Sequence, residues 1–114
     1  MAIQVTIIGL GQIGASMGMA LSKHTDTLFR VGHDKEYNVE REAHKKGAVD
    51  KSEHNLPTAV RDARLVVLAL PITEIRETLA FIAQDLQNGL GACEAAGNKD
   101  TMNALLALPF EESD

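Results

Sequence analysis

Residues Gln4-Val5-Thr6-Ile7-Ile8-Gly9-Leu10-Gly11-Gln12-Ile13-Gly14 form a mostly apolar strand pattern that runs directly into G-x-G-x-x-G. Such a strand is typical of the buried centre of a parallel sheet. Gly9 permits a tight turn, Gly11 lets a pyrophosphate approach the backbone, and Gly14 lets the next helix pack closely on the sheet. The helix N-terminus itself attracts phosphate. The stretch therefore predicts a turn that binds a nicotinamide or flavin dinucleotide, with candidate contacts at Gly9, Leu10, Gly11, Gln12, Ile13 and Gly14.

An acidic residue follows at the spacing that such a turn requires. The predicted second strand ends in His33-Asp34, and Asp34 comes 20 residues after Gly14. A carboxylate there can accept hydrogen bonds from both ribose hydroxyls of an adenosine, and its charge would repel a 2′-phosphate. NAD is therefore favoured over NADP, although Lys35 and Arg41 are close enough in sequence to soften that repulsion. His33 is a further candidate contact near the adenosine.

The rest of the chain alternates strand patterns with helix patterns. Alternation of this kind produces a parallel sheet with right-handed crossovers. We therefore expect an α/β fold, with a doubly wound, mostly parallel sheet in a single domain over residues 1–110 and an acidic tail at 111–114. The predicted strands are 3–8, 28–32, 48–50, 64–70 and 91–96, and the predicted helices are 12–23, 36–46, a short turn from Pro57, 72–86 and 100–108.

Composition narrows the class of protein. The chain has 114 residues, is 45% hydrophobic and carries a net charge of −5, which argues against nonspecific binding to nucleic acid or to an anionic membrane. Cys93 is the single cysteine, so no internal disulfide can form, and the four histidines lack metal-ligand spacing. No apolar stretch has transmembrane length, and no signal-peptide pattern is present. We expect a cytoplasmic protein without a metal.

The predicted fourth strand ends in Leu70-Pro71, where parallel sheets bind their ligands. We expect both residues to border the nicotinamide half of the cofactor, although a proline here also suits the start of a helix. Lys99 falls on the same side after the predicted fifth strand, where a solvated lysine is the simpler interpretation. Hydride transfer from an alcohol needs a proton acceptor beside the nicotinamide, and no histidine follows His54. No catalytic residue is therefore assigned.

Four segments carry a resemblance to a known family: residues 5–16 (V-T-I-I-G-L-G-Q-I-G-A-S), 31–34 (V-G-H-D), 47–50 (G-A-V-D) and 62–71 (D-A-R-L-V-V-L-A-L-P). In this order and spacing the chain resembles the N-terminal domain of prephenate and arogenate dehydrogenases, within a wider group that includes 6-phosphogluconate and hydroxyisobutyrate dehydrogenases. The resemblance implies an NAD(P)-binding Rossmann domain. In the full enzyme, hydride would pass from the substrate to the nicotinamide.

Residues 93–99 loosely resemble the family's T-D-x-x-S-x-K segment. Glu94 stands for the aspartate and Lys99 matches, but Gly97 replaces the serine that borders the substrate. The family continues to a G-x-H-P segment with the catalytic histidine and to a helical substrate and dimerisation domain, both expected to be absent here. The resemblance thus implies a cofactor domain that is inactive, or nearly so, in isolation.

Loss of the helical domain would uncover apolar surface near the end of the chain. We therefore expect self-association through the C-terminal region, which contains Leu105, Leu106 and Leu108. A second hypothesis is a non-catalytic nucleotide sensor, like the regulatory domains of potassium transport systems. Those domains usually carry Gly-Asp after the third strand, where this chain has Val49-Asp50-Lys51, and Leu70-Pro71 fits dehydrogenases better.

Overall fold

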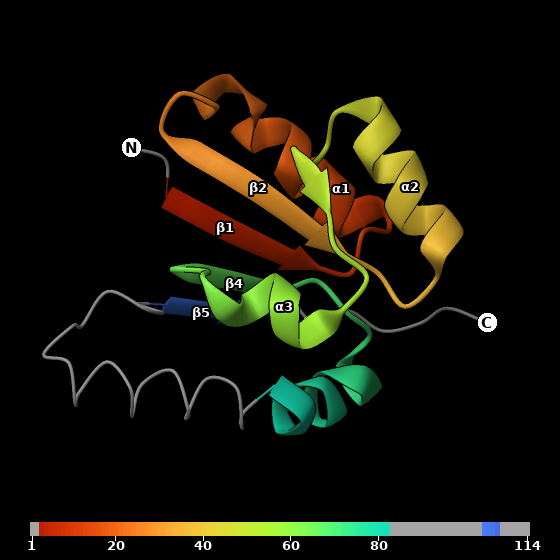
Figure 1. The fold of residues 1–114 in the computed structure, drawn as a ribbon. Coiled ribbons are helices and arrows are strands. Elements are labelled where there is room, and N and C mark those ends of the chain that lie inside the picture. The colour runs from red at the N-terminus through yellow and green to blue at the C-terminus, as the bar shows by residue number, and fades with distance from the viewer. Residues whose placement is uncertain (1–2, 83–103, 108–114) are drawn as a thin grey trace, which may run out of the picture.

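Strands and helices alternate along the chain, as the sequence pattern predicts. The computed structural model describes residues 3–82 and 104–107. The elements are β1 (Ile3–Ile8), α1 (Gln12–Ala20), the 3₁₀ helix η1 (Leu21–His24), β2 (Leu28–His33), α2 (Tyr37–Lys46), β3 (Lys51–Ser52), α3 (Leu56–Arg61), β4 (Leu65–Leu68), a helix described over 72–82, and β5 (Ala104–Ala107) (Figure 1).

In the described residues the sheet is parallel throughout, with the spatial order β3-β2-β1-β4-β5. β1 lies at its centre and pairs with β2 along six residues and with β4 along four. The chain moves from β1 outward to β2 and β3, and then crosses to β4 on the other side of β1. The doubly wound α/β fold is thereby confirmed. The direction of winding reverses between β1 and β4, which is where this architecture forms its ligand crevice.

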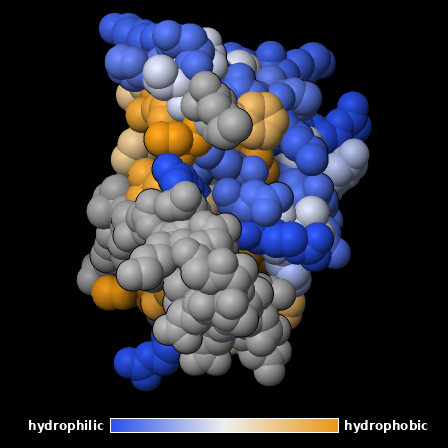
Figure 2. Space-filling view, turned by 60° about the vertical axis from the view of Figure 1, so that its left-hand side comes forward, coloured by the Kyte–Doolittle hydropathy of each residue, from blue (hydrophilic) through white to orange (hydrophobic). Residues whose placement is uncertain are grey.

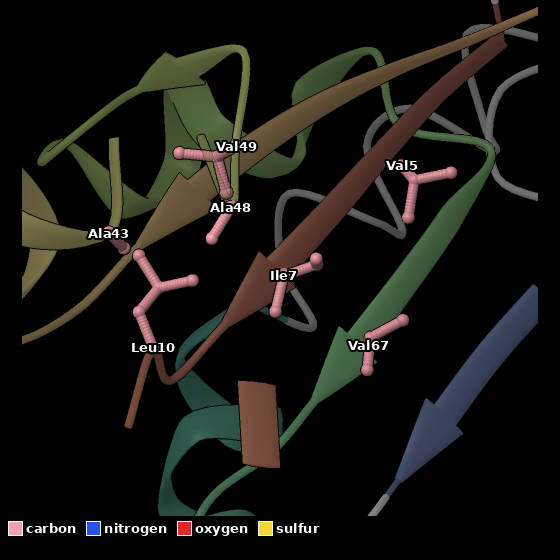
Figure 3. Close-up of a cluster of buried hydrophobic side chains, with 7 residues drawn as sticks. All are labelled: Val5, Ile7, Leu10, Ala43, Ala48, Val49 and Val67. Atoms are coloured by element: carbon pink, nitrogen blue, oxygen red, sulfur yellow. The ribbon is translucent and has the colours of Figure 1, made fainter. Parts of the chain in front are cut away.

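β4 is a continuous apolar run, and β1 is apolar except for Gln4 and Thr6, because helices cover both faces of the sheet. α1 and α2 lie over one face, and α3 and the 72–82 helix lie over the other (Figure 1). Successive strand residues point to opposite faces, so Ile7 and Ile8 enter different clusters. The first cluster, drawn in Figure 3, is Val5, Ile7, Leu10, Ala43, Ala48, Val49 and Val67. The second is Ile8, Val60, Ala63, Val66, Leu68 and Ile82.

A buried arginine joins three elements on the α1 and α2 side. The Arg30 guanidinium donates to both carboxylate oxygens of Asp50, at 3.0 and 3.1 Å. Its Nη1 also donates to the carbonyls of Gly18, Gly47 and Ala48, at 2.7 to 3.0 Å. Only 4% of Arg30 is exposed. We call this set the Arg30 clasp. It ties the end of α1 and the end of α2 to the segment that leads into β3.

The edge strand begins later than predicted. We expected residues 48–50, whereas β3 covers Lys51–Ser52. The cause is the end of α2, where Gly47 adopts the left-handed conformation at φ +86°. The Ala48 N–H then donates to the Ala43 carbonyl at 2.9 Å and completes the helix cap. Residue 48 therefore belongs to the helix cap, and the hydrogen-bonded pairing of β3 with β2 starts three residues later, at Lys51.

The prediction of a helix over residues 100–108 is wrong for 104–107, which are the residues of this range that the structure describes. Ala104–Ala107 forms β5, which pairs with β4 in parallel. Alanine and leucine favour helices, but that preference is weak beside the gain from satisfying the open N–H and C=O groups along β4. The predicted strand at 91–96, the end of the predicted helix beyond residue 82 and the acidic tail 111–114 lie outside the described residues.

Candidate functional site

A groove of about 1080 Å³ opens at the carboxyl ends of β1, β2 and β4. The glycine turn after β1 forms one side, the segment after β2 forms another, and the 72–82 helix forms the opposite wall. This is the position at which doubly wound sheets bind ligands. The predicted contact residues that line the groove are Gly9, Gly11, His33, Asp34, Leu70 and Pro71.

The other predicted contact residues do not line the groove. The Leu10 side chain is 3% exposed and packs in the core (Figure 3), so only its backbone faces the turn. Gly14 is buried within α1. Gln12 and Ile13 are exposed in the first turn of the helix. Gln12, Ile13 and Gly14 can therefore meet a ligand through the backbone N–H groups of the first helical turn, whereas the Leu10 N–H donates to Asp34 Oδ2 at 2.8 Å. Lys99 lies outside the described residues.

The glycine turn has a conformation that side chains at two positions would prevent. Gly9 has φ +94°, and its N–H donates to the His33 carbonyl at 2.8 Å. A Cβ at Gly9 would overlap the Ala69 carbonyl oxygen. A Cβ at Gly14 would overlap the Gly9 carbonyl oxygen. Turn and helix therefore pack backbone against backbone, as the sequence pattern predicts.

Gly11 differs from these two glycines because a Cβ there would meet no atom within 4 Å. It is the N-cap of α1 and supplies no side-chain cap. The first turn contains no acidic residue. Since the first N–H groups of a helix have no partner within the helix, they remain suited to an anion at this position. The open space at Gly11 is the approach that a phosphate would need.

Asp34 links β2 to the glycine turn. Its Oδ2 accepts a hydrogen bond from the Leu10 N–H at 2.8 Å, and its Oδ1 accepts one from the Glu36 N–H at 2.9 Å. A carboxylate oxygen can accept two hydrogen bonds, so each oxygen retains capacity for a ligand hydroxyl. The two motifs that the sequence places 20 residues apart therefore meet directly.

The groove is rich in carboxylates. Asp34, Glu36, Glu74 and Glu77 lie along it, together with one lysine and two histidines, among the described residues. Lys35 Nζ donates to Glu74 Oε1 at 3.1 Å, so this ion pair connects the segment after β2 with the opposite wall. Because the carboxylates outnumber the cations, the site is poorly suited to an additional phosphate on the ribose.

The sequence interpretation missed two residues of this region, Glu40 and His54. Glu40 is 1% exposed although it lies in a helix whose pattern is mostly charged. Its Oε2 accepts hydrogen bonds from the Asp34 N–H and from His54 Nδ1, both at 3.1 Å. His54 lines the groove. The sequence offered no signal for either residue, because a lone glutamate among charged neighbours normally faces solvent.

None of the helices in the part of the chain that the structure describes has the length and apolar character needed to cross a membrane. On the face drawn in Figure 2, hydrophobic residues gather along the left edge and hydrophilic residues along the top and the right side. Large hydrophobic side chains at the surface are Ile3, Ile13, Met19, Phe29, Tyr37, Ile72 and Phe81.

Sequence comparison matches residues 17–107 to the family model described as "Prephenate dehydrogenase, nucleotide-binding domain". The prephenate dehydrogenase of Lactococcus lactis subsp. cremoris (strain MG1363) is 36% identical over 97 residues. That match covers 84% of this chain and 27% of the relative, so the chain spans about a quarter of that protein's length. The glycine turn at 9–14 precedes the range of the family match and is supported by its own geometry.

Solved structures of related enzymes share the fold. Synechocystis arogenate dehydrogenase superposes with a TM-score of 0.66 at 24% identity, covering 73% of this chain and 29% of that one. A prephenate dehydrogenase from A. aeolicus, in complex with hydroxyphenyl propionate and NAD+, gives a TM-score of 0.61 at 21% identity, covering 80% of this chain and 39% of that one.

Proposed function

The chain belongs to the family of prephenate dehydrogenase nucleotide-binding domains, and we propose that it binds NAD in the groove beside the glycine turn. The observation that carries the proposal is the hydrogen bond from the Leu10 N–H to Asp34 Oδ2, at 2.8 Å. This hydrogen bond holds the proposed ribose carboxylate, Asp34, directly against the proposed phosphate-binding turn. The A. aeolicus relative contains NAD+ in its structure.

In the proposed complex the pyrophosphate lies over Gly11 and the N-terminus of α1. The adenosine ribose donates hydroxyl hydrogen bonds to Asp34, and His33 lies beside the adenosine. The nicotinamide extends along the groove toward Leu70 and Pro71, which line its other end. The glycine turn lies between these two ends, as the central pyrophosphate of a dinucleotide requires.

NAD is preferred over NADP because the ribose end of the groove is acidic. A 2′-phosphate would approach Asp34 and Glu36, and Lys35, the lysine among the described groove residues, donates to Glu74 at 3.1 Å. Like charges in a partly enclosed groove repel each other more strongly than they do in bulk water. We expect NADP to bind in the same orientation with lower affinity.

The first test is a calorimetric titration of the 114-residue chain with NAD, NADH, NADP and NADPH, followed by the same titrations of Asp34→Ala. We expect the parent to prefer NAD, and the variant to lose roughly tenfold or more of its NAD affinity, since a hydrogen bond to a charged group contributes about 1.5–3 kcal/mol. The loss of NADP affinity should be smaller, because repulsion of the 2′-phosphate is relieved at the same time.

Asp34→Asn and Asp26→Ala serve as controls for these titrations. The asparagine retains an acceptor for the Leu10 N–H but lacks the charge, and Asp26 is exposed and does not line the groove. Equal losses for NAD and NADP in Asp34→Ala would contradict the ribose role. Absence of binding for all four nucleotides in the folded parent would overturn the proposed function.

As part of a dehydrogenase, the domain would present the nicotinamide for hydride transfer at the Leu70-Pro71 end of the groove. We assign neither substrate binding nor the proton acceptor to any described residue. The chain by itself is therefore proposed to bind NAD without converting substrate. The nucleotide-sensor alternative is less favoured, because the sequence relative and the two structural relatives named above are dehydrogenases.

We also propose that the protein is located in the cytoplasm, where thiols stay reduced, because the single cysteine cannot form an internal disulfide.

Self-association through the C-terminal region is also part of the proposal. Among the described strands β5 lies at the end of the sheet, and the outer edge of a terminal strand can offer N–H and C=O groups to a second chain. Light scattering at several protein concentrations should show a mass that rises with concentration. Leu105→Lys should reduce that rise, whereas Ile3→Lys, at the exposed start of β1, should leave it unchanged. A monomer of constant mass up to millimolar concentration would contradict the expectation.

A further inference from the structure

We propose that His33, Glu40 and His54 form a binding site for a divalent cation of the zinc type beside the dinucleotide groove. The three side chains come from the end of β2, from α2 and from the segment before α3. One nitrogen from each imidazole and one oxygen from the carboxylate all lie within 4.8 Å of one another. Two nitrogens and one carboxylate oxygen are a ligand set that zinc commonly takes in proteins.

Glu40 is the strongest argument for a cation. It is 1% exposed, and the side-chain nitrogens within 4 Å of its carboxylate, among the described residues, belong to two histidines. Its Oε2 lies 3.1 Å from His54 Nδ1 and 3.8 Å from His33 Nδ1. Burial of a carboxylate is costly unless an opposite charge compensates it. A divalent ion between these three side chains would supply that charge directly.

One ligand separation is close to that of a tetrahedral zinc site, and the three ligand atoms lie within 4.8 Å of one another. Zinc lies about 2.0–2.2 Å from nitrogen and oxygen ligands, so its ligand atoms are roughly 3.3 Å apart. The separation of 3.1 Å between Glu40 and His54 already has this size. Half of the His54 side chain is exposed, so the ring is free to adjust toward a bound ion.

His33 is oriented as zinc-binding histidines usually are. Its Nδ1 lies 3.1 Å from the Glu53 carbonyl oxygen, which can only accept a hydrogen bond. Nδ1 therefore carries the proton, and Nε2 is the nitrogen left for a metal. A ligating histidine that donates its other N–H to a carbonyl is held in both tautomer and ring orientation. The fold thus supplies the outer support of the site as well as its ligands.

An ion bound at this site would lie beside the dinucleotide groove. His33 and His54 both line it, and Glu40 Oε2 accepts the Asp34 N–H at 3.1 Å. Three protein ligands leave a fourth position of a tetrahedral ion for water or for a ligand in the groove. If both bind, the cation and the dinucleotide would change each other's affinity by the same factor.

The test is a titration of the untagged 114-residue chain with Co²⁺ and Zn²⁺ alone, followed by calorimetry and by the visible absorption of cobalt. All proteins carry Cys93→Ser, so that the thiol cannot compete. We expect one equivalent to bind, with affinity reduced by more than about tenfold in His54→Ala and in Glu40→Gln, since even loss of an outer-shell partner costs 10–100-fold. His24→Ala is the matched control, because His24 is exposed and outside the cluster, and it should bind as the parent does.

The rings of this cluster also contact each other: His33 and His54 are tilted by 32° with centroids 5.5 Å apart, and Tyr37 meets His54 edge-on at 5.6 Å. A cluster that serves packing alone would bind no stoichiometric metal, and that result would overturn the proposal. Equal affinity in the parent and His54→Ala would overturn it as well. His54 is half exposed, so this variant is expected to fold, and circular dichroism checks that it does. The result does not depend on whether NAD binds.

Discussion

Gly14→Ala is expected to abolish measurable NAD binding and to lower the free energy of unfolding by roughly 3 kcal/mol. A Cβ at this position would overlap the carbonyl oxygen of Gly9, which is backbone and cannot rotate away. α1 must therefore move away from the glycine turn, and the N–H groups at its N-terminus move with it. Denaturant unfolding measures the stability, and calorimetry with NAD measures the affinity.

Gly11→Ala separates the effect of a methyl group on stability from its effect on NAD binding. A Cβ there meets no atom within 4 Å, but alanine is a poorer N-cap than glycine, so we expect a loss of stability below about 1 kcal/mol. NAD binding should weaken, because the methyl group occupies the approach of the pyrophosphate. Ser16→Ala, on the exposed side of α1, should change neither quantity. Should Gly14→Ala bind NAD like the parent, the phosphates do not lie on this turn. Should Gly11→Ala also do so, the proposed position of the pyrophosphate is wrong.

The centre of the fold and the phosphate-binding turn could be predicted because their signals are local. β1 is a mostly apolar run, and Gly9 and Gly14 after it are required by backbone contacts that no side chain permits. The spacing from Gly14 to Asp34 reflects a fixed path through α1 and β2, so residue number was enough to place the carboxylate beside the turn. Predictions that rest on backbone sterics are largely independent of the rest of the sequence.

The remaining features depend on contacts between distant residues. Glu40 and His54 are 14 residues apart, in a helix and a loop, and their meeting follows from how α2 lies over the sheet. β5 was predicted as part of a helix because Asp100 suits an N-cap and Pro109 a helix end, whereas pairing with β4 decides its structure. Leu10 was predicted as a cofactor contact, and its side chain turned inward because the core beside Gly32 has room for it. Tertiary contacts of this kind leave no periodic trace in a sequence.

Arg30→Met is expected to lower the free energy of unfolding by roughly 3 kcal/mol or more, since a buried charge pair and several buried acceptors lose their partner together. The arginine is 4% exposed and satisfies Asp50 and the carbonyls of Gly18, Gly47 and Ala48. Arg30→Lys should recover only part of the loss, because one ammonium group cannot reproduce the planar fork. Arg61→Met, at an exposed arginine at the end of α3, is the matched control.

The Arg30 clasp also determines how stability responds to acid. Hydrogen bonds from the Arg30 side chain hold the pKa of Asp50 below its ordinary value of 3.8, against the opposing effect of burial. A carboxyl group whose pKa is lower in the folded state stabilises that state above its unfolded pKa, and this contribution disappears as the pH falls through the folded value. The parent should therefore lose stability below about pH 4 more steeply than Arg30→Met does, in unfolding curves taken from pH 6 downward. Parallel acid profiles for the two proteins would show that Asp50 gains nothing from the clasp. The buried guanidinium would then serve the three carbonyls alone.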